Sequence, residues 1–148
     1  MAPAKLRLLL GIGLMWLIGC GSKGPEESKN LNQIKDLKTK QYAIAGRELY
    51  MLHCANCHQK DGTGLGLLIP PLKNADYMLE NPERTARIIR HGIKGEIVVN
   101  GERYNQPMPG NPSLKPIELA QLMTYIFTNW GDGEIRYSVE EVNQFLAP

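Results

Sequence analysis

The sequence predicts a small all-α domain, a few helices joined by long loops around a non-protein group. Apolar residues recur at helical spacing in several segments, and no segment shows the sustained alternation of exposed strands. A length of 148 residues is enough for one ordinary domain. With 2 Phe, 6 Tyr and 2 Trp against 15 Gly and 10 Pro, the chain is short of large apolar side chains for a core. This shortage leaves room for a cofactor.

The charge balance excludes binding by bulk electrostatics. The chain carries 17 basic and 15 acidic side chains, a net charge of +2, so it has no polybasic footprint and no nucleic-acid partner is expected. Its three cysteines are an odd number, so they cannot all pair within one chain.

The first 19 residues are predicted to be a signal peptide. Lys5 and Arg7 precede an apolar run over 8–18 that is too short to span a bilayer. The run ends in Leu17-Ile18-Gly19-Cys20, which resembles the lipobox of bacterial lipoproteins and implies lipidation of Cys20. The mature protein would then be formally neutral and anchored on the periplasmic side of the cell envelope, with Gly21 favouring the outer membrane over the inner. An ordinary signal peptide with a chance cysteine is the alternative.

The mature chain divides into a tether, 20–41, and a domain, 42–148. The tether is polar; Leu31, Ile34 and Leu37 have a spacing that permits a short helix, but composition favours a flexible segment. In the domain, helices are predicted from 42 to about 54, over 82–91 behind an Asn-Pro start, over 116–130, and from Ser138 to Leu146 behind a capping box. The stretch 95–113 is predicted to be loop with a brief extended pair near 97–99.

The string Cys54-Ala55-Asn56-Cys57-His58 carries the chemistry. Two thiols three positions apart at a helix end can add across the two vinyl groups of a haem, and the adjoining histidine then lies under the iron. A thioredoxin-like redox pair would need a βαβ context, a structural zinc site would need two more ligands, and a plain disulfide would not need His58. The sequence offers none of that context.

From Tyr42 to Trp130 the chain resembles the class I c-type cytochromes, here in lipoprotein form. The resemblance implies a cytochrome c-like fold around one covalent haem c, with Cys54 and Cys57 as thioether attachments. A methionine 50 residues after His58, Met108, lies in a prolyl loop that resembles the family's distal methionine loop and is the expected sixth ligand.

Other residues compete for these roles or support them. Met78 is a second possible ligand, whereas Met51 and Met123 are assigned to the core; His53 and His91 are poorly placed. The resemblance implies that the carbonyl of Pro70, or failing that Pro71, accepts a hydrogen bond from His58. It also implies that Tyr104 belongs to the haem environment, and Arg103 and Trp130 are further candidates for hydrogen bonds to the propionates.

Two further patterns concern packing and the surface. In the family the terminal helices cross at a glycine, which implies that Gly46 allows close approach while Tyr50, Leu122 and Tyr125 pack around it. Basic residues recur on and just after the 82–91 helix, and they are predicted to form a solvated face or, alternatively, a docking patch for an acidic partner. They are Arg84, Arg87, Arg90 and Lys94.

The predicted function is electron transfer by a single His/Met-ligated haem, with no catalysis by the chain itself. The partners would be protein redox donors and acceptors of respiratory or dehydrogenase systems, met transiently, together with the lipid bilayer. A haem-based peroxidase or small-ligand-binding protein, with a displaceable sixth ligand, is the alternative. A third possibility is a fixed cytochrome subunit of a larger oxidoreductase.

Overall fold

The computed structural model describes residues 29–131 and 133–148. The predicted signal peptide and Cys20 lie outside these residues. In chain order the elements are α1 (Lys29–Gln33), α2 (Leu37–His53), α3 (Ala55–His58), α4 (Asp76–Leu79), α5 (Pro82–His91), β1 (Gly92–Ile93), β2 (Ile97–Val99), β3 (Glu102–Tyr104), β4 (Met108–Pro109), α6 (Pro116–Trp130) and α7 (Val139–Leu146). The predicted all-α fold is confirmed, with four very short strands added.

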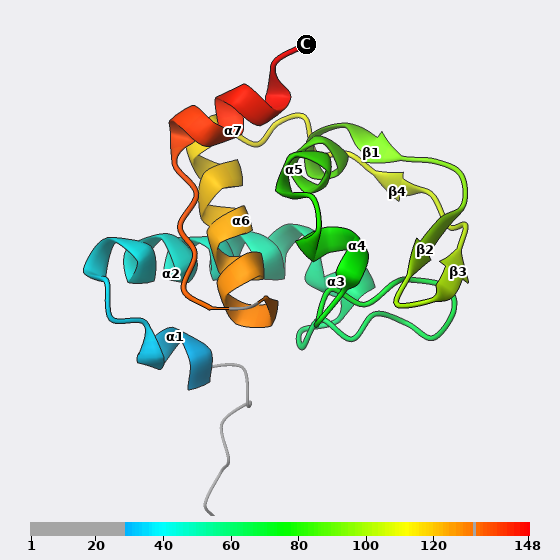
Figure 1. Ribbon diagram of the computed structural model, residues 1–148, viewed down its shortest axis with the longest axis horizontal. Coiled ribbons are helices and arrows are strands. Elements are labelled where there is room, and N and C mark those ends of the chain that lie inside the picture. Colours follow the sequence, from blue (N-terminus) through cyan, green and yellow to red (C-terminus); the bar gives the residue numbers. More distant parts are fainter. Residues whose placement is uncertain (1–28, 132) are drawn as a thin grey trace, which may run out of the picture.

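The two long helices, α2 and α6, cross closely and form the centre of the fold (Figure 1). A Cβ atom added at Gly46 would lie 2.0 Å from the backbone oxygen of Gln121, so only glycine allows this approach. Tyr50, Leu122 and Tyr125 are fully buried around the crossing, as predicted. The rings of Tyr50 and Tyr125 also pack against Trp130, with centroids 4.8 and 5.4 Å from it.

The helix ends follow the predicted start signals. Asn81 caps α5 by accepting a hydrogen bond from the Arg84 N–H at 2.8 Å, and Pro82 is the first helical residue. Ser138 and Glu141 form the predicted capping box of α7, with distances of 2.8 and 3.2 Å. These caps act within one helical turn, so they define where α5 and α7 begin.

The prediction of a tether over 20–41 is wrong for residues 29–41. Leu31 and Ile34 are buried in the core cluster, and α2 begins at Leu37, five residues before the predicted start. The Glu134 carboxylate holds this segment by accepting hydrogen bonds from the backbone N–H groups of Lys35 and Asp36, at 3.1 and 2.8 Å. Its partner is therefore about a hundred residues away, where local composition gives no sign of it.

The C-terminal segment covers one end of the α5 and α6 pair. In α7, Val142 is fully buried, and the ring of Tyr137 packs edge-on against Phe127 with centroids 5.1 Å apart. In Figure 1 α7 lies at the top of the molecule, above α6 and beside α5. No helix within 29–131 or 133–148 is long and apolar enough to cross a membrane.

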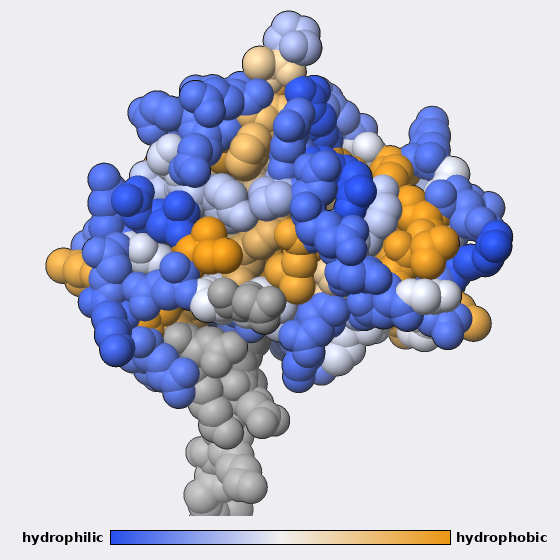
Figure 2. Space-filling model, viewed as in Figure 1, coloured by the Kyte–Doolittle hydropathy of each residue, from blue (hydrophilic) through white to orange (hydrophobic). Residues whose placement is uncertain are grey.

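The stretch predicted as loop, 95–113, contains three short strands, and a fourth, β1, lies just before it. β2 pairs with β3, and β1 pairs with β4, so that Ile93 lies opposite Met108. The first pair is the predicted extended pair, and the second joins the end of α5 to the methionine loop. Figure 2 shows hydrophobic residues gathered at the right of the molecule, over β2 and β4.

Candidate functional site

One largely apolar cavity lies beneath this hydrophobic surface. Its volume is about 130 Å³, and it opens to solvent. Its walls come from the segment after α2, from α5, from α6 and from the loop around β4. The lining includes Cys54, Cys57, His58, Pro70, Met78, Ile88, Ile89, Tyr104, Met108 and Ile126.

The thiol pair lies where α2 ends and the one-turn helix α3 begins. The Cys54 N–H closes α2 by donating to the Tyr50 carbonyl at 2.8 Å, and the Cys54 carbonyl accepts from the N–H groups of Cys57 and His58. This turn puts both thiols and the imidazole beside one cavity. Burial raises the pKa of the Cys54 thiol to about 12, and the neighbouring Cys57 adds to the shift. A redox-active thiol pair requires a lowered pKa, so the thioredoxin-like alternative is disfavoured.

His58 is buried at 6% exposure and is held through one ring nitrogen. Its Nδ1 lies 3.1 Å from the Pro70 carbonyl oxygen, so Nδ1–H donates and Nε2 keeps its lone pair. Burial lowers the pKa of His58 below its ordinary value, and the hydrogen bond to Pro70 opposes that shift in part. At neutral pH the side chain is therefore a neutral imidazole, the form that binds a metal.

Gly64 places the carbonyl of Pro70. It adopts a φ of +71°, and a Cβ atom there would lie 2.3 Å from the Ile69 oxygen and 2.7 Å from the Pro70 carbonyl carbon. Its N–H donates to the His58 carbonyl at 3.0 Å. The loop can turn back under His58 only because this position has no side chain.

Met108 reaches the same cavity from β4. Two glycines let its loop pack against the end of α5, since a Cβ atom at Gly92 would lie 2.5 Å from the Met108 carbonyl oxygen and one at Gly110 would lie 2.4 Å from the His91 carbonyl carbon. The structure thus brings His58 and Met108, 50 residues apart in the chain, to one cavity.

Some of the remaining predicted site residues line the cavity and others do not. Pro70, Pro71 and Tyr104 line the cavity, and Met78 does so as well. Arg103 is exposed and pairs with Glu96 at 2.6 Å, while Trp130 packs in the aromatic cluster; neither belongs to the lining. His53 and His91 are exposed and lie outside the lining, as predicted.

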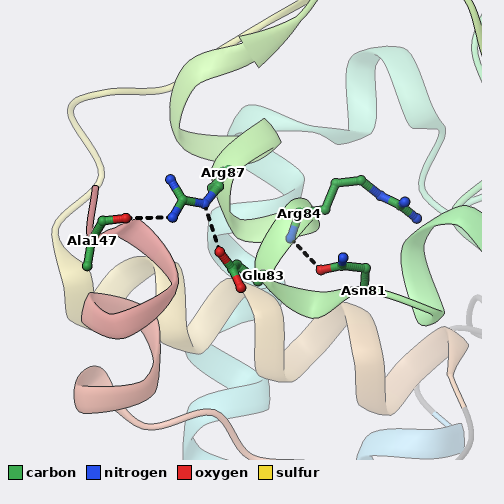
Figure 3. Close-up of polar contacts among 5 residues, drawn as sticks. All are labelled: Asn81, Glu83, Arg84, Arg87 and Ala147. Atoms are coloured by element: carbon green, nitrogen blue, oxygen red, sulfur yellow. Dashed lines mark hydrogen bonds and ion pairs between the residues drawn. The ribbon is translucent and has the colours of Figure 1, made fainter.

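The basic residues of α5 are not a free solvated face. The Arg84 guanidinium stacks 3.8 Å from the Tyr77 ring centre and donates to the Tyr77 carbonyl. Arg87 bridges Glu83, at 3.1 Å, and the Ala147 carbonyl, at 2.5 Å, which links α5 to the end of α7 (Figure 3). Arg90 donates to the Pro112 carbonyl at 2.8 Å. The three arginines connect α5 to three neighbouring segments. Their regular spacing in the sequence did not reveal that each has a different partner.

The donor set fits a covalently bound haem better than a bare metal ion. Within the described part of the chain no three His, Cys, Asp or Glu side chains come together as a metal site requires. Two free thiols and a neutral imidazole beside an apolar cavity are what a c-type haem needs. Fold and site together define a protein that carries haem through Cys-x-x-Cys-His.

The similarity of this sequence to known proteins agrees with that class. The family model "Cytochrome c" matches residues 43–130, and the chain belongs to the cytochrome c family. Its cofactor is therefore covalently bound haem c.

Two kinds of relative are similar to this chain. Cytochrome c-552 of Thermus thermophilus is 33% identical over 111 residues, which cover 69% of this chain and 84% of that protein. The cytochrome c subunit of the alcohol dehydrogenase (quinone) of Gluconacetobacter polyoxogenes is 33% identical over 93 residues, and that of Gluconobacter oxydans is 32% identical over 91. In both subunits the match covers 19% of the relative. These similarities support an electron carrier and not a catalyst.

Proposed function

We propose that the protein carries single electrons through one haem, with Cys54 and Cys57 as thioether attachments and His58 and Met108 as axial ligands. The observation that carries this proposal is the single apolar cavity that all four side chains line. The haem supplies a one-electron ferric/ferrous couple. The protein supplies attachment, orientation and a dry environment.

Each ligand side chain has a distinct part in this function. The hydrogen bond from His58 Nδ1 to the Pro70 carbonyl fixes the plane of the imidazole ring and makes Nε2 more basic. The Met108 thioether favours ferrous iron and so raises the reduction potential relative to a second histidine. The aliphatic side chains of Ile88, Ile89 and Ile126 exclude water from the cavity, which also favours the less charged, reduced state.

Electrons would pass through the edge of the cavity on which Cys57 lies exposed. Partners that bind transiently use small, wet interfaces, and such an edge suits a respiratory or dehydrogenase partner. We propose a separate carrier, with a fixed subunit of a larger oxidoreductase as the alternative. If the protein co-purified in a stable complex with an oxidoreductase, the proposal of a separate carrier would be contradicted.

Attachment to the periplasmic side of the envelope, with the outer membrane favoured, rests on the sequence around Cys20, which lies outside the described residues. Two or more acyl chains on this cysteine would hold the protein firmly at a bilayer. Mass spectrometry of the N-terminal peptide should show a lipidated Cys20, and Cys20→Ala should move the haem protein to the soluble fraction. An unmodified peptide starting elsewhere would contradict the anchor.

The ligand assignment is tested by the optical spectrum of the oxidised protein. A methionine-ligated ferric haem has a weak far-red sulfur-to-iron charge-transfer band, which should be lost in Met108→Ala. Met78→Ala is the matched control, since Met78 is the second methionine of the cavity and is 4% exposed; this variant should keep the band. Absence of the band from the unaltered protein would favour the peroxidase or small-ligand-binding alternative.

A further inference from the structure

The loop that presents Met108 is rich in proline. We define the methionine strap as residues 105–113, Asn-Gln-Pro-Met-Pro-Gly-Asn-Pro-Ser. Three of its nine residues are prolines, which have no N–H to donate. None of its side chains is charged. The strap is held by the pairing of β4 with β1 and by hydrogen bonds to the last turn of α5.

The last turn of α5 supplies two successive attachments just after Met108. The Asn111 N–H donates to the Ile89 carbonyl at 2.8 Å. One residue later Arg90 Nη1 donates to the Pro112 carbonyl, also at 2.8 Å. Ile89 itself lines the cavity, so the wall of the cavity and the strap across it are joined at one helical turn.

Arg90 is suited to this contact in a way that a lysine is not. Its side chain is half-buried, and its Nε is shielded from solvent without a hydrogen-bond partner among the described residues. The planar guanidinium presents its N–H donors in a rigid arrangement, so less side-chain freedom is lost in the hydrogen bond to Pro112 than a lysine would lose. A charged donor forms a stronger hydrogen bond to a carbonyl than a neutral one does.

We propose that Arg90 is a positioning residue for the sixth ligand: it holds the methionine strap against α5 and so keeps Met108 at the cavity. This inference rests on the proposed function, in which Met108 is that ligand. Without Arg90 the strap opens more often, and an external ligand competes more effectively for the sixth position.

The test is titration of the oxidised holoprotein with imidazole. The apparent affinity is the intrinsic affinity multiplied by the fraction of open strap, so a larger open fraction gives tighter apparent binding. We expect Arg90→Met to bind imidazole about tenfold more tightly than the unaltered protein, which corresponds to about 1.4 kcal/mol. The limiting association rate at saturating imidazole, which reports strap opening, should rise as well.

Two variants separate this effect from general loosening. Arg87→Met is the matched control, because Arg87 lies on the same helix but contacts Glu83 and Ala147 instead of the strap. It should bind imidazole as the unaltered protein does. Arg90→Lys keeps the positive charge and N–H donors but loses the planar guanidinium, and its imidazole affinity should lie between those of Arg90→Met and the unaltered protein.

Each outcome decides. Equal imidazole affinity in Arg90→Met and the unaltered protein, or an equal gain in Arg87→Met, overturns the role of Arg90. Met108→Ala gives the affinity of an unprotected sixth position. If it binds imidazole much more tightly than the unaltered protein does, the ligand assignment stands whatever Arg90 does. If the two bind equally, Met108 is not the ligand, and the proposed function fails with it.

Discussion

Replacing Gly46 with alanine tests the close crossing of α2 and α6. The new Cβ atom would lie 2.0 Å from the Gln121 carbonyl oxygen and 2.8 Å from Tyr125 Cβ, whereas ordinary contacts begin at 3.4 Å. The helices must therefore separate by about 1.4 Å at this point, since the obstructing oxygen belongs to the backbone and cannot rotate away. Overpacking of this kind costs about 1 to 3 kcal/mol.

Alanine also has an advantage that opposes this cost. In a helix interior it is favoured over glycine by about 1 kcal/mol. Because the obstructing atom belongs to the backbone, we expect an overpacking cost near the upper end of the range, about 3 kcal/mol. The gain of about 1 kcal/mol in helix propensity leaves a net decrease of about 2 kcal/mol in the free energy of unfolding. For a domain of this size the thermal midpoint should fall by about 8 °C.

Thermal and denaturant unfolding of the holoprotein, followed by far-UV circular dichroism, measures the change. Ala45→Gly, one position along the same helix, is the control for helix propensity and should lose about 1 kcal/mol. If Gly46→Ala were instead more stable than the unaltered protein, propensity alone would be acting. The close crossing would then be refuted.

Three further changes test other parts of the fold. Ile34→Ala should lower the free energy of unfolding by about 2 kcal/mol, because this residue is buried in the core, whereas a tether residue would change it by less than about 0.5. Gly64→Ala combines a positive φ with a contact at 2.3 Å and should cost about 3 kcal/mol in denaturant unfolding, against about 1 for Gly66→Ala, which has a positive φ and open space. Tyr137 has its pKa raised to about 12 by burial, so the folded state prefers the neutral phenol. The stability that it contributes is complete below pH 10 and falls by about 2 kcal/mol towards pH 12; unfolding across this range should show a smaller loss in Tyr137→Phe. Equal pH profiles for the two proteins would contradict this account of Tyr137.

The helices with strong local signals were predictable from the sequence, and so was the glycine of the helix crossing. Asn81 before Pro82 and the capping box at Ser138 act within one helical turn, so they can be recognised from the neighbouring residues alone. The role of Gly46 was predicted from the family resemblance. The structure explains it, because the backbone of Gln121 lies too close to Gly46 for any side chain there. The thiol pair and its histidine were predictable because their spacing follows from haem chemistry.

The rest depends on contacts between distant segments. Residues 29–41 are held by the burial of Leu31 and Ile34 and by hydrogen bonds to Glu134, and the sequence near Ile34 does not reveal these distant contacts. Arg90 looked like one member of a basic row, because a one-dimensional pattern does not distinguish an arginine facing solvent from one facing a carbonyl. Gly92 lets the methionine loop approach the end of α5, and this role depends on a strand pairing in which Gly92 lies opposite Pro109, seventeen positions later.

The central claim is that Met108 binds the iron opposite His58. Proton NMR of the reduced holoprotein measures this most directly, because the ring current of the haem moves the methyl signal of a bound methionine far upfield. The account predicts one such three-proton signal, present in Met78→Ala and absent from Met108→Ala. No upfield methyl signal in the unaltered protein, or one that survives in Met108→Ala, would contradict it.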